Sequence, residues 1–121
     1  MNNIDLNKVL KNLRSESKAD WIGLREMKET TTYRVVRDLK PASNNISIDH
    51  GIMVEVLVDG QFGYYGTHNI SYDSIKNATD KAYLQALNAS KYSIHKFSTD
   101  VRPKSVGTYK SNYSIKHIAL D

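Results

Sequence analysis

Apolar residues recur at helical spacing near the N-terminus of the chain, between positions 4 and 18. They stand at i, i+3, i+4 and i+7, at Leu6, Val9, Leu10 and Leu13. This spacing is one apolar stripe of an amphipathic helix, and Asn3 or Asp5 can cap its start by accepting backbone N–H groups. A helix of this length is marginal by itself, so we expect a sheet or another helix to cover the stripe.

The pattern changes at Asp20 to one that is typical of strands. Residues 20–29 and 31–38 are rich in β-branched and aromatic side chains, and each segment is predicted to form a strand. Residues 41–45 combine a proline, a serine and two asparagines, which predicts a loop before the next strand.

The clearest strand prediction covers residues 51–59. Its three alternate valines share one face, as the two-residue period of a strand requires. Asp59 and Gly60 then predict a type I′ turn, because both central residues of that turn need positive φ. The return strand covers residues 61–67, so the whole segment is predicted to be a β-hairpin.

A second helix is predicted to begin after Ser71, which is a good N-cap, and to run to about Ser90. Asp73 in its first turn suits the positive end of the helix dipole. The alanines on its apolar face predict a close approach to the sheet. Residues at helical spacing are Ile75, Ala78, Ala82, Ala86 and Leu87.

These elements together predict an α+β fold. We expect an antiparallel sheet of about four strands with a long β-hairpin, packed by the N-terminal helix and the second helix. Residues 91–121 show no regular hydrophobic pattern of a helix or a strand. A segment of about 30 residues without such a pattern is long for a loop inside a compact domain. We therefore expect an α+β domain over residues 1–90 and an extended connector over residues 91–121.

Composition narrows the function classes. The 121 residues include no cysteine, which excludes disulfides, thiolate metal sites and thiol nucleophiles. No apolar run has the length of a signal peptide or a membrane span, so we expect a cytoplasmic protein without membrane contact. The net charge is +4, and residues 91–116 carry six basic residues against one acid. Such a strip can contact nucleic-acid phosphates, but we favour a solvated or partner-facing tail.

Candidate catalytic and metal-binding groups are sparse. The four histidines are separated by at least 18 residues, and none has a glutamate beside it: His50, His68, His95 and His117. A hairpin could bring His50 near His68, but two histidines make at most half a zinc site. The acids close to this hairpin are also poor candidates for a catalytic carboxylate pair, because Asp59 is needed by the turn and Glu55 is expected to face solvent. We therefore predict no catalytic residue and no metal ligand in this chain.

Aromatic residues provide the candidate contacts. Two glycines flank Tyr64 and Tyr65, which is typical of a bulge, or of an edge strand that accepts an extended peptide or a partner strand. Tyr109 lies among lysines, where it could stack on bases or meet another domain. The predicted peptide or partner contacts are Phe62, Tyr64, Tyr65 and Tyr109.

This order of elements resembles the N-terminal region of the TldD/PmbA ("modulator of DNA gyrase") family over almost the whole chain. Ala19-Asp20 is similar to the "AD" before the family's first strand, and GIMVEVLVDG with QFGYYGT (residues 51–67) is similar to its glycine-bounded hairpin. The helix after Ser71 stands where the family has an alanine-rich helix. Gly107-Thr-Tyr-Lys-Ser111 resembles an element of the linker toward its larger domain. The hairpin turn and this tail are nearer the TldD branch.

The resemblance implies a longer parent protein, a zinc metallopeptidase that acts on short unfolded peptides. In that family an HExxxH helix and a further ligand hold the zinc, and the proteins pair as homodimers or with a PmbA-like partner subunit. This sequence has no HExxxH. The resemblance therefore implies a non-catalytic N-terminal domain that contributes to the substrate chamber and to dimer contacts, with zinc only in the parent. The alternative is a small stand-alone module that binds nucleic acid or associates with DNA gyrase.

Overall fold

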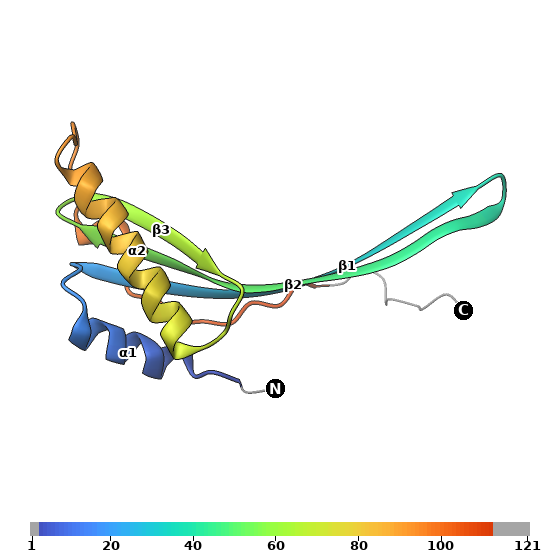
Figure 1. Ribbon diagram of the computed structural model, residues 1–121, viewed down its shortest axis with the longest axis horizontal. Helices are drawn as coiled ribbons and strands as arrows, with labels where there is room; N and C mark the ends of the chain where they lie inside the picture. The colour runs from blue at the N-terminus through green and yellow to red at the C-terminus, as the bar shows by residue number, and fades with distance from the viewer. Residues whose placement is uncertain (1–2, 113–121) are drawn as a thin grey trace.

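A three-stranded antiparallel sheet in the order β1-β2-β3 is the centre of the computed structural model, which describes residues 3–112 (Figure 1). Two helices pack on one face of the sheet, and a short 3-10 turn follows in the C-terminal segment. The α+β prediction is confirmed. The elements are α1 (Leu6–Glu16), β1 (Trp21–Arg37), β2 (Lys40–Val58), β3 (Gln61–Thr67), α2 (Tyr72–Ser90) and η1 (Thr99–Val101).

The first hairpin is longer than the sequence pattern predicts. The predicted strands over residues 20–29 and 31–38 are one strand, β1, which pairs with β2 out to Arg37 and Lys40. The loop predicted for residues 41–45 is wrong, because those residues lie within β2. The chain turns instead at Asp38 and Leu39, whose φ angles of 52° and 61° suit a two-residue hairpin loop.

Pro41 fits into β2 because the pairing is irregular where it lies. The register between the two strands shifts between Val35 and Val36, and Pro41 is paired with Val36. A proline removes one N–H donor from a ladder, so within sheets it is found at bulges and free edges. The bulge and the outer strand position together accommodate it, which the composition of residues 41–45 did not reveal.

The second hairpin is confirmed as predicted. Val58 pairs with Gln61, and the turn residues Asp59 and Gly60 have φ angles of 46° and 77°. Both values are positive, as the type I′ turn requires. The same turn is a docking point for the C-terminal segment, because a Cβ at Gly60 would lie 2.6 Å from the Lys96 Cβ.

The core lies between the sheet and the helices. The two helix starts are as predicted: the Asp5 side chain accepts from the backbone of α1, and Ser71 accepts from Ser74 N of α2. The alanine face of α2 does approach the sheet closely, as the sequence predicts, because a Cβ at Gly63 would lie only 3.1 Å from the Ala86 Cβ. The buried cluster includes Val9, Leu13, Ile22, Ile52, Val54, Val56, Val58, Ile75, Ala78, Ala82 and Ala86.

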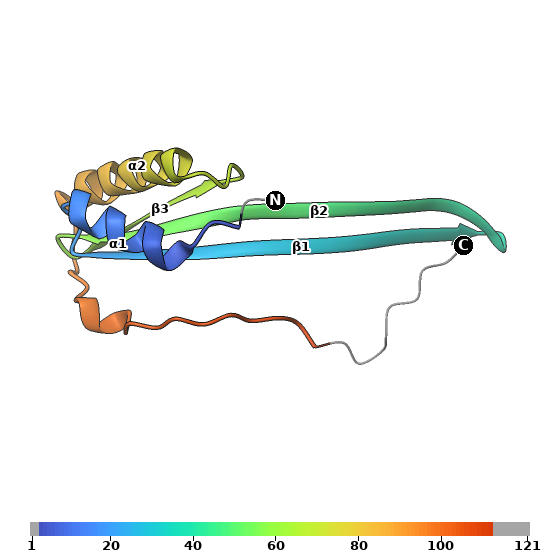
Figure 2. The same cartoon turned by 90° about the horizontal axis from the view of Figure 1, so that it is seen from below.

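Beyond the helices the first hairpin continues as a two-stranded arm (Figures 1 and 2). Strand β3 ends at Thr67, opposite Ile52, so residues 27–37 and 40–51 pair only with each other. Most residues of this arm are exposed. No helix within residues 3–112 is long and apolar enough to cross a lipid bilayer.

Candidate functional site

A long groove follows the outer edge of β1. Its walls come from α1, from the first residues of β1, and from the segment 101–107 that follows η1. Its volume is about 1130 Å³. Residues from both faces of the sheet line it, so the groove wraps around the edge strand. We call it the β1 groove, and its main side chains are Leu6, Leu10, Arg14, Trp21, Leu24, Arg25, Tyr64, Arg102, Lys104 and Val106.

The edge of β1 that borders this groove has no strand partner within residues 3–112, because β1 is the first strand of the sheet and pairs only with β2. Figure 2 shows the C-terminal segment running along the sheet on the side away from the two helices. This segment makes no backbone hydrogen bond to β1 among the described residues. The other residues that the structure describes therefore leave the N–H and C=O groups on that side of β1 without backbone partners.

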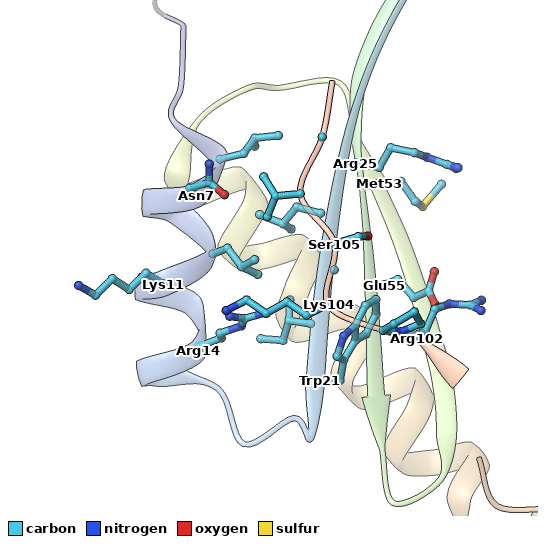
Figure 3. A pocket seen from close by; sticks show the side chains of 18 of the residues that line it. Asn7, Lys11, Arg14, Trp21, Arg25, Met53, Glu55, Arg102, Lys104 and Ser105 are labelled. Atoms are coloured by element: carbon cyan, nitrogen blue, oxygen red, sulfur yellow. The ribbon is translucent and has the colours of Figure 1, made fainter. Parts of the chain in front are cut away.

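Basic side chains dominate the charge of the β1 groove. Arg14 reaches from α1 and Lys104 from the C-terminal segment into the space between α1 and β1 (Figure 3). Neither side chain, nor that of Arg25 near the other end, has an ion-pair partner in the part of the chain that the structure describes. The single acid in the lining is Glu55. The β1 groove therefore contains three cationic side chains, those of Arg14, Arg25 and Lys104, that form no ion pair with other residues in the range 3–112.

Glu55 is committed to a contact that holds the C-terminal segment against the second face of the sheet. Its Oε1 accepts a hydrogen bond of 2.7 Å from Arg102 Nε, and this interaction raises the pKa of Arg102. The Arg102 guanidinium also lies 5.0 Å from the centre of the Phe62 ring. The expectation that Glu55 faces solvent is therefore wrong, because a residue 47 positions away covers it.

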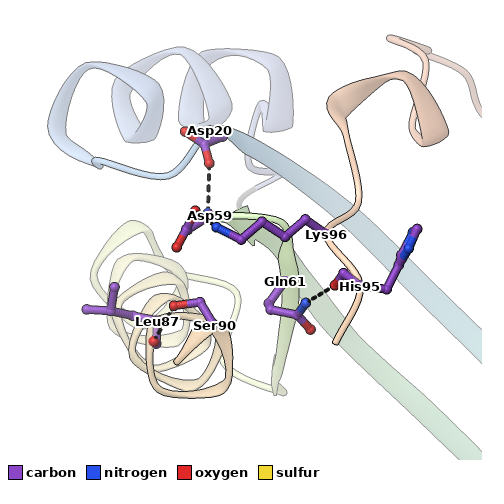
Figure 4. Close-up of polar contacts among 7 residues, drawn as sticks. All are labelled: Asp20, Asp59, Gln61, Leu87, Ser90, His95 and Lys96. Carbon is purple, nitrogen blue, oxygen red and sulfur yellow. Dashed lines mark hydrogen bonds and ion pairs between the residues drawn. The ribbon is translucent and has the colours of Figure 1, made fainter. Parts of the chain in front are cut away.

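A second docking point lies at the turn between β2 and β3 (Figure 4). Lys96 Nζ is 2.9 Å from Asp59 Oδ1, and Asp20 Oδ2 accepts from the Asp59 backbone N–H at 2.9 Å. The Gly60 carbonyl accepts from the Phe97 N–H, and Gln61 Nε2 donates to the His95 carbonyl. The start of the C-terminal segment is thus fixed to the turn, and the segment leaves from there along β1.

The four predicted contact residues lie in three different places. Phe62 is half-buried and packs against Phe97, with ring centres 5.4 Å apart. Tyr64 lines the β1 groove, whereas Tyr65 points to the opposite face, where Lys81 Nζ lies 4.8 Å from its ring centre. Tyr109 is 86% exposed in the C-terminal segment. The structure therefore brings Phe62 and Tyr64 to one face and separates Tyr65 and Tyr109 from them.

The edge of β3, next to Tyr64 and Tyr65, is less open than that of β1. Gln85 of α2 accepts from the Tyr64 backbone N–H at 2.7 Å, which satisfies one donor of that edge. The aromatic residues suggested an open edge at β3, whereas no open edge was predicted at β1. No local pattern signals the β1 groove, because its cations come from segments that are distant in the sequence.

The three histidines within residues 3–112 do not assemble a metal site. His50 Nε2 lies 2.7 Å from Glu26 Oε1, its cross-strand diagonal neighbour on β1. Within residues 3–112 no group of three or more histidine, aspartate or glutamate side chains is placed to hold a metal ion. His117 lies outside the described residues.

A comparison with known protein families gives a match over the middle of the chain. Residues 24–86, just over half of the chain, match the family model described as PmbA/TldA metallopeptidase domain 1. The matched segment runs from β1 through most of α2, and so covers the arm, both hairpins and the alanine-rich helix. No curated protein and no solved structure matches the chain.

Proposed function

The chain belongs to the PmbA/TldA metallopeptidase domain 1 family, and from that premise we propose that it is the non-catalytic N-terminal domain of a zinc metallopeptidase that cleaves short unfolded peptides. In this proposal residues 1–90 are the domain proper, and residues 91–121 are the connector toward the catalytic part. The protein is cytoplasmic and acts as a homodimer or with a PmbA-like partner subunit. We place it nearer the TldD branch.

The arm is the observation that carries this proposal. An isolated two-stranded hairpin is marginally stable in water, yet this one extends well beyond the body of the domain. Ile46 and Ile48 are 62% and 60% exposed on the face that, further along β2, carries the buried core residues. A covering surface would remove these two isoleucine side chains from water. The arm therefore fits a wall of the substrate chamber or a dimer contact.

Zinc belongs to the parent protein in this proposal, and the residues of this domain do not fit it. His50 is engaged by Glu26, and no third ligand stands near it among the described residues. The family's HExxxH sequence is not present in the 121 residues. We therefore assign this chain no step of hydrolysis, and its contribution is to hold a peptide or a partner subunit.

The rival function is a nucleic-acid or gyrase-associated module that uses the basic C-terminal segment. Part of that charge is already committed inside the domain, because Lys96 pairs with Asp59 and Arg102 pairs with Glu55. These pairs leave fewer cations for a phosphate backbone, which supports the peptidase proposal over its rival.

The reading frame that follows Asp121 separates the two proposals. We expect it to continue and to encode an HExxxH helix, and the encoded protein to hydrolyse short peptides in a zinc-dependent assay. A stop codon after Asp121, together with salt-sensitive DNA binding by the purified chain, would replace the peptidase proposal with the nucleic-acid one.

A further inference from the structure

We propose that the β1 groove binds an extended peptide with acidic side chains, which adds to the sheet as a strand on the outer edge of β1. The proposal concerns residues 21–25 of β1 and the surfaces on either side of them. It assigns to this domain a direct role in selecting peptides, in addition to the structural role proposed above.

The backbone of β1 provides the first part of the site. In an antiparallel sheet, alternate residues of an edge strand present N–H and C=O groups away from their neighbour. Along residues 21–25 these groups face the groove and not another strand of the described chain. An extended peptide satisfies such groups by pairing with them, which is the general mode of β-strand addition.

The size of the groove favours a chain over a small molecule. Sites for small molecules measure roughly 300–1,000 Å³, whereas the β1 groove measures about 1130 Å³ and is open along its length. Residues 104–107 form its far wall and make no backbone hydrogen bonds to other described residues. A peptide between β1 and this wall has backbone partners on both sides.

Charge complementarity identifies the side chains of the peptide. Arg14 and Lys104 enter the same space beside Trp21 without a counter-ion among residues 3–112, and Arg25 stands four residues further along β1. Like charges that converge in this way repel each other unless an anion lies between them. A carboxylate of the peptide in that space satisfies both cations.

Apolar side chains of the groove define the alternate positions of the peptide. Leu6 and Leu10 come from α1, Val106 comes from the C-terminal segment, and the Trp21 ring occupies the space beside Gly23 where a Cβ would lie. Successive side chains of a strand point to opposite faces, so a peptide that alternates acidic and apolar residues matches this lining. The choice of a peptide over a nucleic acid rests on the proposed function, because both are extended and anionic.

The test measures binding to the 121-residue chain by fluorescence anisotropy. The probe is a labelled, N-acetylated eight-residue peptide in which glutamate alternates with valine. We expect it to bind, and the double variant Arg14→Glu/Lys104→Glu to weaken binding by about tenfold, since two charges that attract the peptide become charges that repel it. The matched control is Lys91→Glu/Lys110→Glu, which reverses two exposed charges outside the groove lining and leaves peptide binding unchanged.

A second probe tests the strand pairing without changing the protein. The same peptide, N-methylated at every backbone nitrogen, keeps its charge but has no N–H group to donate to an edge strand, so we expect its binding to be lost. Equal binding of the methylated and unmethylated peptides, or equal binding of an oligothymidylate of the same charge, would overturn the proposal. Self-association of the chain that is abolished in the Arg14→Glu/Lys104→Glu variant would also overturn the proposal, because a second copy of the chain would then occupy the β1 groove. These results are independent of whether the parent protein hydrolyses peptides.

Discussion

Replacement of Gly63 by alanine tests how closely α2 lies on the sheet. Gly63 is buried in β3 and faces α2. A Cβ at this position would overlap the Ala82 carbonyl oxygen and lie 3.0 Å from the carbonyl carbon and 3.1 Å from the Ala86 Cβ. These atoms are helix backbone and a buried methyl group, so no flexible side chain can move aside. The helix as a whole must shift outward.

The magnitude follows from the cost of overpacking. Extra methyl groups in a packed core cost about 1–3 kcal/mol, and the rigid surroundings of Gly63 place it at about 2–3 kcal/mol. A domain of this size loses roughly 4 °C of melting temperature per kcal/mol, so the Gly63→Ala variant should melt about 8–12 °C below the wild type. The assay is thermal unfolding followed by far-UV circular dichroism.

Gly66→Ala is the matched control in the same strand. Its Cβ would make only ordinary van der Waals contacts, the nearest with the flexible end of Met53 at 3.6 Å. The melting temperature of Gly66→Ala should therefore stay within about 2 °C of the wild type, as for ordinary surface changes. If Gly63→Ala also melted within about 2 °C of the wild type, the close contact between α2 and β3 would be refuted.

Three further predictions concern the turn, an ion pair and the C-terminal segment. Gly60→Val should lower the unfolding free energy by about 1–3 kcal/mol because φ is positive there, and an unchanged denaturation midpoint would contradict the turn geometry. The hydrogen bond from Lys76 lowers the pKa of Glu16 in the folded protein. The contribution of this pair to the free energy of unfolding is therefore fully present above the ordinary carboxyl pKa, and it is lost as the pH falls through the lowered pKa of Glu16. The difference in melting temperature between wild type and Glu16→Gln should therefore shrink from about pH 7 to about pH 3, and a difference that grows would contradict the pairing. Amide exchange should be slow at Phe97, which donates to Gly60, and fast over residues 104–110; slow exchange across 104–110 in a monomer would mean that this segment completes the domain.

Local patterns in the sequence predicted the parts of the fold that depend on local physics. The helix caps at Asp5 and Ser71, the type I′ turn at Asp59-Gly60 and the alanine face of α2 are each determined by a few neighbouring residues. The exception was the first hairpin. Residues 41–45 have the composition of a loop, but pairing with the opposite strand outweighs that local preference, and the turn moves to Asp38-Leu39.

The candidate site was predictable only in part. Of the two alternatives for β3, a bulge or an edge strand, the structure has the edge strand, but Gln85 satisfies one donor of that edge. The more open edge is that of β1, and it is surrounded by Arg14, Arg25 and Lys104. Arg14 and Lys104 come close only through the packing of α1 and the path of the C-terminal segment, and Arg25 lines the groove further along β1. No spacing rule along the sequence connects them, so the groove becomes visible only in three dimensions.

The central claim is that this domain contributes contacts and not chemistry. The most direct measurement is zinc content and peptide hydrolysis, by elemental analysis and mass spectrometry, for the chain of 121 residues and for the full product of its reading frame. We expect no stoichiometric zinc and no peptide cleavage for the 121-residue chain alone. For the full product we expect bound zinc and peptide cleavage. One tightly bound zinc per 121-residue chain, lost in the variants His50→Ala and His68→Ala and accompanied by peptide cleavage, would contradict the central claim.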